Sequence, residues 1–473
     1  MVFSSFMFLF VFLAAHLLVY AVTPRRHKNK VLLVSSLIFY AWGGPRYLFL
    51  LMGETAVCWF FALRIERSDD ERKRRGALVA TCIIMLGLLG YFKYAGFLLG
   101  IVQNAFGVPE QIPAIVLPIG ISFYTFQLIS YVCDVYRKQV EAQPAYWKLL
   151  LYSSLFHQCI AGPIVRYETV AHEIDHRKPR RHDVYYGVRR FCVGLGKKTL
   201  LANACASAAD TLVPVGDAAL ASQAVAGYWL GMLFYMLQIY LDFSAYSDMA
   251  IGLGRMIGFH YLENFDHPYM ASSVQDFWRR WHISLSSFFR DYVYIPLGGS
   301  RCSTLRYVRN MAVVWLLTGL WHGASWNYVL WGLYFFVLLL LERFLIRGRL
   351  PKPIGHACAL VAVFFGWVLF RFESFEDLAT VITGMFGSAA GGLTTLSVQT
   401  VFLQNVFLII ASIIACTTLG THLRKRLLAS SRTNDQTAAM LGILDAVTPP
   451  ALLVLSAIAM AGASYNPFIY FQF

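Results

Sequence analysis

One polar run inside an apolar stretch, residues 317–327, contains the side chain best suited to proton transfer, His322. His322 follows Arg309, the last residue of a basic cluster, by 13 positions, or ~20 Å along a helix axis. This distance places the imidazole well inside a hydrocarbon core that is ~30 Å thick. A neutral imidazole can accept a hydroxyl proton near pH 7, which acyl transfer to an alcohol requires. A histidine at this depth could instead hydrogen-bond between helices, and the sequence leaves both roles open.

The residues around His322 predict room for a ligand. Gly319 and Gly323 carry no side chain, so we expect the backbone to open there and a substrate to approach closely. Asn327 ends the same polar run, and its amide could help to hold an oxyanion. The run therefore predicts a site within the membrane.

A second run, residues 275–301, alternates aromatic side chains with arginines, as in a helix that lies at a membrane interface. Its arginines could meet lipid phosphates and simply anchor the chain. They could also bind a phosphate-rich ligand on the cytoplasmic side, with Arg279 or Arg280 as the partner of the anion. His282 follows these two arginines closely.

Two carboxylates, Asp242 and Asp248, lie in an otherwise apolar segment that is rich in small residues. Ionisable groups inside a membrane are costly and usually functional. We expect these two to pair with basic or hydroxyl groups and to hold broken helices together. The nearby run 263–269 contains Pro268, which breaks a helix, so we expect this run to line a cavity or to cap a helix.

The composition of the 473-residue chain predicts an all-α polytopic membrane protein. Hydrophobic residues make up 58% and charged residues 14%, which excludes a soluble globule of average composition. The formal net charge of +14 indicates basic cytoplasmic loops, and we predict no nucleic-acid partner.

The nine cysteines show no metal or disulfide spacing. The run 166–190 holds three histidines among arginines that would repel a cation, so it predicts a solvated loop and no metal site.

The basic residues also predict how the chain crosses the membrane. Residues 2–22 are apolar for too long to be a typical signal sequence, and the basic cluster 25–30 after them places the N-terminus outside. Most other basic residues fall in five further clusters that we expect to be cytoplasmic. We predict about a dozen transmembrane and re-entrant helices, including a hairpin over 31–63 broken at 43–45, in one membrane domain over residues 1–473.

Four central motifs resemble those of the membrane-bound O-acyltransferase (MBOAT) family: LDFSAYSDMAIG, ENFDHPY, FWRRWHISLSSFFRDYVYIPLGGS and LTGLWHGASWNYVLWG. The similarity continues in LPIGISFYTFQLISYVCDVYR (117–137), in AGPIVR (161–166) and in the C-terminal FIYFQF. It covers nearly the whole chain, with a catalytic core over about 117–342. The most similar branch is the bacterial one that contains the membrane subunits of alginate, peptidoglycan and cellulose O-acetylation and of teichoic acid D-alanylation.

The resemblance implies an MBOAT-like fold and a multi-pass enzyme of the bacterial cytoplasmic membrane. It implies His322 as the catalytic histidine and His282 as a second histidine on the cytoplasmic side of a tunnel. The donor would be acetyl-CoA, another acyl-CoA or an acyl carrier protein thioester, whose phosphates would meet basic residues such as Arg279 and Arg280. No cofactor would be bound permanently. The acyl group would leave on the outside, for a polysaccharide or for an extracytoplasmic SGNH-type acyltransferase, in a site bordered by membrane lipid.

Three other functions are compatible with the sequence. A lipid-modifying MBOAT acyltransferase would share the chemistry and differ in its acceptor. A secondary transporter would also contain broken helices and buried carboxylates, but it should show two similar halves, which are not seen here. A flippase or polymer export channel without catalysis fits the composition, and only the histidine motifs argue against it.

The charge distribution predicts the side of the membrane on which two loops lie. In a variant without the nine native cysteines, Asp69→Cys and Asn434→Cys should each react with a membrane-impermeant maleimide only after the cells are opened, because basic clusters keep these loops in the cytoplasm. Labelling is measured by gel shift on intact and on opened spheroplasts. Labelling of position 69 in intact spheroplasts would show that the true topology is the inverse of the predicted one, with the donor side outside.

Overall fold

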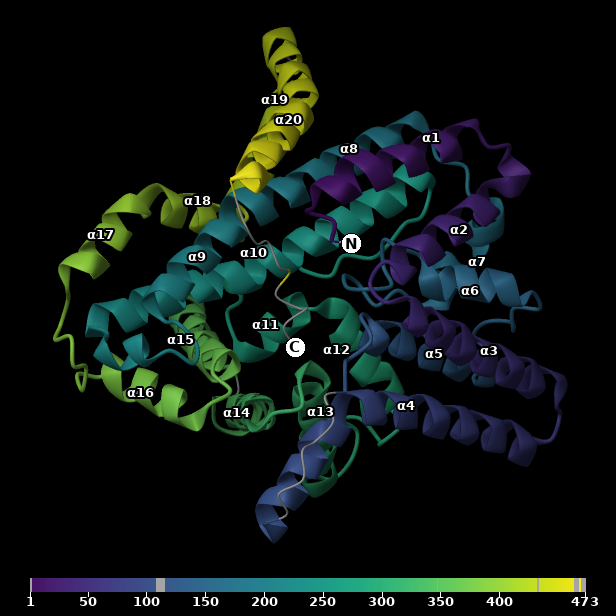
Figure 1. Ribbon diagram of the computed structural model, residues 1–473, viewed down its shortest axis with the longest axis horizontal. Helices are drawn as coiled ribbons and strands as arrows, with labels where there is room; N and C mark the ends of the chain where they lie inside the picture. The colour runs from purple at the N-terminus through teal and green to yellow at the C-terminus, as the bar shows by residue number, and fades with distance from the viewer. Residues whose placement is uncertain (1, 108–114, 347, 432–433, 463–467, 469–473) are drawn as a thin grey trace. The chain divides into compact units, whose positions relative to one another are not determined.

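Every regular element that the structure describes is a helix, which confirms the all-α fold (Figure 1). The computed structural model describes residues 2–107, 115–346, 348–431, 434–462 and 468, so of the C-terminal FIYFQF only Phe468 is included. The chain divides into two compact units, each of which is described by itself. The first comprises residues 1–188, 249–263 and 290–293, and the second comprises residues 189–248, 264–289 and 294–473.

The first unit contains the N-terminal helices. They are α1 (Ala14–Val22), α2 (Lys28–Ala41), α3 (Pro45–Arg67), α4 (Glu71–Phe106), α5 (Ile121–Tyr136), α6 (Tyr146–Ser154) and α7 (Tyr167–His176). A π-helical stretch over Met7–Leu13 precedes α1, so the helix predicted over 2–22 begins at Met7. The break between α2 and α3 falls at Gly43 and Gly44, and Pro45 occupies the first turn of α3. This confirms the predicted hairpin.

The second unit contains the polar runs that the sequence singles out. Its helices are α9 (Asn203–Leu212), α11 (Val274–Arg280), α12 (Ile283–Phe289), α13 (Thr304–His322), α14 (Trp326–Leu341), α15 (Lys352–Arg371), α16 (Phe375–Met385), α17 (Leu396–Gln404), α18 (Val406–Cys416), α19 (Leu419–Ser430) and α20 (Asp435–Ala461). Helices α8 (Arg181–Gly196) and α10 (Val225–Ile257) contribute residues to both units. Pro268 begins a short 3₁₀ turn between α10 and α11, where the sequence predicts a break.

Five described helical segments are long and apolar enough to cross a membrane, and a sixth results if the bent pair α17 and α18 is one span. The five are Pro45–Arg67, Glu71–Gln103, Trp326–Ile346, Lys352–Arg371 and Asp435–Ala461. The helical run Met7–Val22 is apolar but shorter. The predicted dozen of transmembrane and re-entrant helices is therefore an approximate figure, because many of the described helices are too short to cross the membrane alone.

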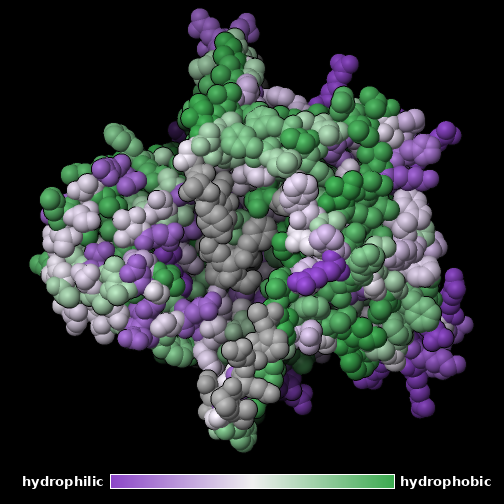
Figure 2. All heavy atoms as spheres, viewed as in Figure 1, coloured by the Kyte–Doolittle hydropathy of each residue, from purple (hydrophilic) through white to green (hydrophobic). Residues whose placement is uncertain are grey.

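Large hydrophobic side chains are exposed on the candidate spans, and hydrophobic residues make up broad areas of the surface in view (Figure 2). Phe49 on α3 is 74% exposed, Ile83 on α4 67% and Ile458 on α20 65%. In water such a surface would aggregate, whereas lipid tails match it. The surface therefore agrees with a membrane protein.

The charged run 166–190 folds into α7 and the start of α8, so it is helical and not the predicted loop. Several of its charges find partners within the first unit, since Lys148 Nζ lies 2.7 Å from Asp175 and Arg255 Nε lies 2.9 Å from Asp183. These ion pairs hold the run in a regular conformation. No group of three or more His, Cys, Asp or Glu that could hold a metal is found among the described residues.

Helices α13 and α14 of the second unit pack backbone against backbone. A Cβ atom added at Gly319 of α13 would lie 2.3 Å from the carbonyl oxygen of Tyr328, and one added at Gly332 of α14 would lie 2.4 Å from that of Trp315. Atoms this close overlap, so only glycine permits the contact. Small residues allow the same close approach between helices in membranes generally.

This contact predicts that Gly332→Ala destabilises the protein. The added methyl group would force α13 and α14 apart, and such overpacking typically costs about 1–3 kcal/mol. The melting temperature of purified protein in detergent should fall and activity should fall with it. Gly53→Ala is the matched control, because a Cβ atom at Gly53 of α3 meets nothing within 4 Å. Equal melting temperatures for the two variants would contradict the role of the contact.

Candidate active site

His322 is the last residue of α13, and the chain leaves the helix at Gly323 in an extended conformation. Its side chain is buried, and its imidazole packs edge-to-face on three aromatic rings. The ring centroids of Trp331, Phe370 and Trp321 lie 4.9, 5.2 and 5.0 Å from that of His322. Such packing fixes the ring orientation and excludes bulk water.

The glycines near His322 serve helix packing, and the approach of a substrate there stays a prediction. Gly319 forms the contact between α13 and α14. A Cβ atom added at Gly323 would lie 2.1 Å from the ring of Tyr328. The space that the missing side chains leave is thus filled by α14, because close helix contact requires small residues at the interface.

His282 lies between α11 and α12, outside the candidate spans, and its backbone has a φ of +44°. This left-handed conformation is uncommon for a residue with a side chain and is held only where the surroundings enforce it. Burial lowers the pKa of the His282 imidazole to about 3, so the ring is neutral at physiological pH. The ring of Phe243 packs edge-to-face on it, with centroids 4.7 Å apart.

One indole separates the two histidines. The ring of Trp321 has its centroid 5.6 Å from that of His282 and 5.0 Å from that of His322. The two imidazoles, which belong to distant motifs of the sequence, therefore flank the same side chain within the second unit. All three residues are buried.

Asn327 lies at the start of α14 close to this group. Its Nδ2 donates to the carbonyl oxygens of Phe370, at 3.2 Å, and Leu369, at 3.4 Å. The side chain is fully buried and ties α14 to the end of α15. The oxyanion role of Asn327 stays a prediction, and the hydrogen bonds show that its amide nitrogen already serves the packing of α15.

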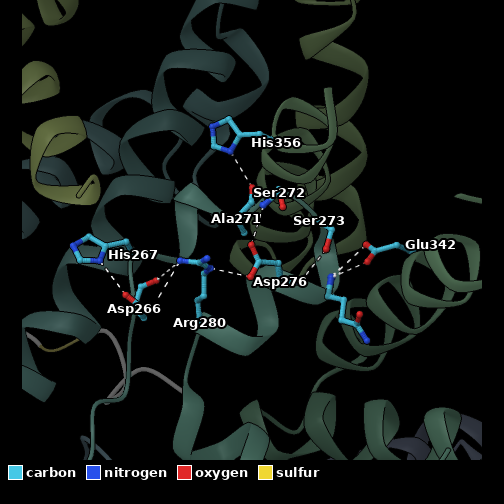
Figure 3. A network of polar contacts seen from close by, with 10 residues as sticks. Asp266, His267, Ala271, Ser272, Ser273, Asp276, Arg280, Glu342 and His356 are labelled. Carbon is cyan, nitrogen blue, oxygen red and sulfur yellow. Dashed lines mark hydrogen bonds and ion pairs between the residues drawn. The ribbon is translucent and has the colours of Figure 1, made fainter. Parts of the chain in front are cut away.

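The two arginines of α11 differ in their partners, and Figure 3 shows those of Arg280. Arg280 Nε donates to Asp276 at 2.9 Å, and its Nη1 lies 3.8 Å from Asp266. Arg279 is exposed and has no carboxylate within ion-pair distance among the described residues. The positive charge of Arg280 is therefore largely compensated, and the anion-binding role of Arg279 or Arg280 stays a prediction.

The segment that carries these arginines is hydrogen-bonded to the end of α14 and to α15 (Figure 3). The carboxylate of Glu342, directly after α14, accepts from the backbone N–H groups of Val274 at 2.8 Å and Gln275 at 3.3 Å. His356 on α15 contacts the carbonyl oxygen of Ala271 through Nδ1, at 2.9 Å. A carboxylate at a helix N-terminus satisfies N–H groups that lack helical partners. Thus α11 and the following His282 are positioned by the helices that surround His322.

Asp242 and Asp248 on α10 are paired with cations, which confirms the predicted structural role. Lys198 Nζ lies 2.8 Å from Asp242, and Lys197 Nζ lies 2.6 Å from Asp248. Arg190 of α8 also contacts Asp248, at 2.9 Å. Buried carboxylates are tolerated only with such partners.

Trp321, Glu342, His356 and Asn264 help to build the site, although none of them was predicted individually. Trp321 and Asn264 lie within the quoted motifs, so the only available signal was their position there. Glu342 directly follows α14, and His356 lies in α15. Their contacts with the segment at the start of α11 can be recognised only in the folded structure.

The match to known proteins agrees with this geometry. Residues 137–379 match the model of MBOAT, the membrane-bound O-acyltransferase family, a range that contains both histidines and their aromatic neighbours. The chain belongs to this family. It is therefore a membrane O-acyltransferase, and MBOAT enzymes need no permanently bound cofactor.

Three MBOAT relatives illustrate the range of similarity. The chain is 38% identical to "Probable alginate O-acetylase AlgI" of Azotobacter vinelandii over the full length of both chains. It is 32% identical to "Peptidoglycan O-acetyltransferase" of Helicobacter pylori, over 84% of this chain and 82% of the relative. It is 27% identical to "Teichoic acid D-alanyltransferase" of Bacillus subtilis, over 54% of this chain and 68% of the relative.

Proposed function

We propose that the chain transfers an acyl group, acetyl by preference, from a cytoplasmic thioester to the extracytoplasmic side, for O-acylation of a cell-surface polysaccharide or of a partner acyltransferase. The observation that carries the proposal is the contact of both His322 and His282 with Trp321, in a buried aromatic environment. Such surroundings suit transfer of a reactive acyl group, because water would otherwise hydrolyse it.

His322 serves as the general base in this proposal. Its imidazole accepts the proton of an acceptor hydroxyl, the hydroxyl oxygen bonds to the acyl carbon, and the carbon–sulfur bond of the thioester breaks. The proton then passes to the leaving thiolate, so the products are an ester and a free thiol. The neutral imidazole is suited to accept the first proton, and the imidazolium that results is suited to donate it. His282 helps to position the donor, and Asn327 is the candidate donor to the oxyanion.

The donor is acetyl-CoA or another acyl thioester, including one on a carrier protein. Arg279 is exposed and lacks a described carboxylate partner, so it can meet phosphate groups of the donor, while Arg280 is engaged with Asp276. This assignment predicts that Arg279 contributes more than Arg280 to donor binding.

The acceptor class follows from the names of the relatives. Alginate and peptidoglycan in the names of the O-acetylating relatives are polymers with hydroxyl groups, as is teichoic acid in the third name. We place the chain in the bacterial inner membrane with its N-terminus outside and treat residues 1–473 as one functional MBOAT domain whose core is 117–342. The full-length similarity to the alginate relative supports this extent.

The base assignment predicts that His322→Ala folds but loses acyl transfer by a factor of ~10²–10⁴ or more. Purified protein in nanodiscs is incubated with labelled acetyl-CoA and a small alcohol, and ester is measured per mole of monodisperse protein. His16→Ala is the matched control, because His16 is similarly buried, at 4% exposure against 5% for His322, and belongs to the first unit. Wild-type transfer by His322→Ala would refute the assignment.

The acceptor assignment predicts that the chain does not complete the reaction on polymer. The purified protein should hydrolyse donor or acylate small alcohols slowly, with little modification of a polysaccharide, because a long polymer needs a water-facing groove that a partner must supply. Adding an extracytoplasmic SGNH-type acyltransferase should restore polymer acylation, and His322→Ala should block the restoration. Efficient polymer acylation by this chain alone would refute the relay.

A further inference from the structure

His282 is held in its left-handed conformation by the segment that precedes α11. The backbone N–H of Ile283 donates to the carbonyl oxygen of Asn264, and the N–H of Asp266 donates to the carbonyl oxygen of Arg280, both at 2.9 Å. These two main-chain bonds lie on either side of His282. They restrain a backbone that is otherwise unfavourable for a residue with a side chain.

The side chain of Asn264 lies against the imidazole of His282. It is fully buried, and its Oδ1 accepts from the backbone N–H of Ser284 at 3.1 Å. A backbone N–H can only donate, so this contact establishes which end of the amide is the oxygen. The same Oδ1 lies 3.3 Å from Nδ1 of His282.

The proton on the imidazole follows from these contacts. An amide oxygen can only accept, so Nδ1 of His282 must carry the hydrogen. The hydroxyl of Ser284 gives the same result. Its one hydrogen is donated to Asn264 Oδ1 at 2.8 Å. Its oxygen lies 3.4 Å from Nδ1 of His282 and can only accept a hydrogen bond from it. In a neutral ring the second nitrogen, Nε2, is then the acceptor.

We propose that Asn264 is a positioning residue for acyl transfer: it fixes the tautomer of His282 with the proton on Nδ1 and so presents Nε2 as a hydrogen-bond or proton acceptor in the site. The inference rests on the proposed function, in which His282 positions the donor. Asn264 and Ser284 contact the ring at Nδ1, and the rings of Phe243, Phe265 and Trp321 pack against it; none of these five side chains is charged. The amide of Asn264 therefore supplies a neutral acceptor that fixes the tautomer.

Two substitutions separate the effect on the tautomer from an effect on folding. Asn264→Asp keeps an oxygen that accepts from Ser284 and from His282 Nδ1, but adds a negative charge beside the ring. Asn264→Leu removes the acceptor and releases the tautomer. Asn310→Leu is the matched control, since Asn310 is also fully buried and hydrogen-bonded, to the carbonyl oxygen of Gly299 at 3.2 Å.

The variants are compared by kcat, KM for acetyl-CoA and the pH dependence of transfer. Asn264→Leu should lower turnover by about 10²-fold, because a misplaced group near the reacting atoms has an effect of that size. Asn264→Asp should retain activity at high pH, with its acidic limb moved upward by about 1 pH unit or more, because a nearby carboxylate favours the protonated imidazole. The acidic limb of Asn310→Leu should stay where it is in the wild type.

A second measurement reads the tautomer without activity. The nitrogen chemical shifts of ¹⁵N-histidine-labelled protein distinguish a proton on Nδ1 from one on Nε2, and His282→Gln identifies the signal of His282. The wild type and Asn264→Asp should show Nδ1–H, and Asn264→Leu should lose this preference. Turnover of the double variant Asn264→Leu, His282→Gln should equal that of His282→Gln alone, because both changes act through one ring.

The outcomes distinguish this proposal from the proposed function. If His322→Ala is inactive but Asn264→Leu turns over normally, or if the His282 signal of the wild type shows Nε2–H, the positioning role is refuted while acyl transfer stands. If His322→Ala transfers normally, the proposed function fails, and the nitrogen shifts still test the tautomer.

Discussion

The arrangement of the second unit depends on one contact, the backbone approach of α13 to α14 at Gly319 and Gly332. Because neither position carries a Cβ atom, α14 comes close enough for Trp331 to meet the imidazole of His322. The same approach brings Asn327 within reach of the carbonyl oxygens at the end of α15. In a membrane, where lipid is as apolar as the side chains, such close packing is a main source of helix association.

Polar groups that this packing buries are satisfied by a small number of neighbours. Asp242 and Asp248 pair with cations of α8 and of the π-helical segment Lys197–Ala202 that follows it, and Glu342 accepts from the start of α11. An uncompensated charge in such surroundings would cost several kcal/mol, so each of these contacts constrains where a helix can begin or end. The histidines are held differently, by aromatic rings and, for His282, by an amide.

The two histidines are oriented by different interactions. His322 ends a helix among aromatic rings, where orientation comes from packing. His282 lies in a strained turn, where orientation comes from hydrogen bonds to Asn264 and Ser284. Trp321 contacts both rings.

The sequence by itself determined the class of the protein, the α2–α3 hairpin, the pairing of the buried aspartates and the polar runs that contain the site. These features depend on local composition and on the high cost of unpaired charge in a membrane, both of which are readable along the chain. Only the tertiary structure decided that Gly319 and Gly323 serve packing and that the run 166–190 is helical. The glycine contacts depend on which residue of the neighbouring helix lies opposite, such as Tyr328, and spacing along the chain does not specify that neighbour.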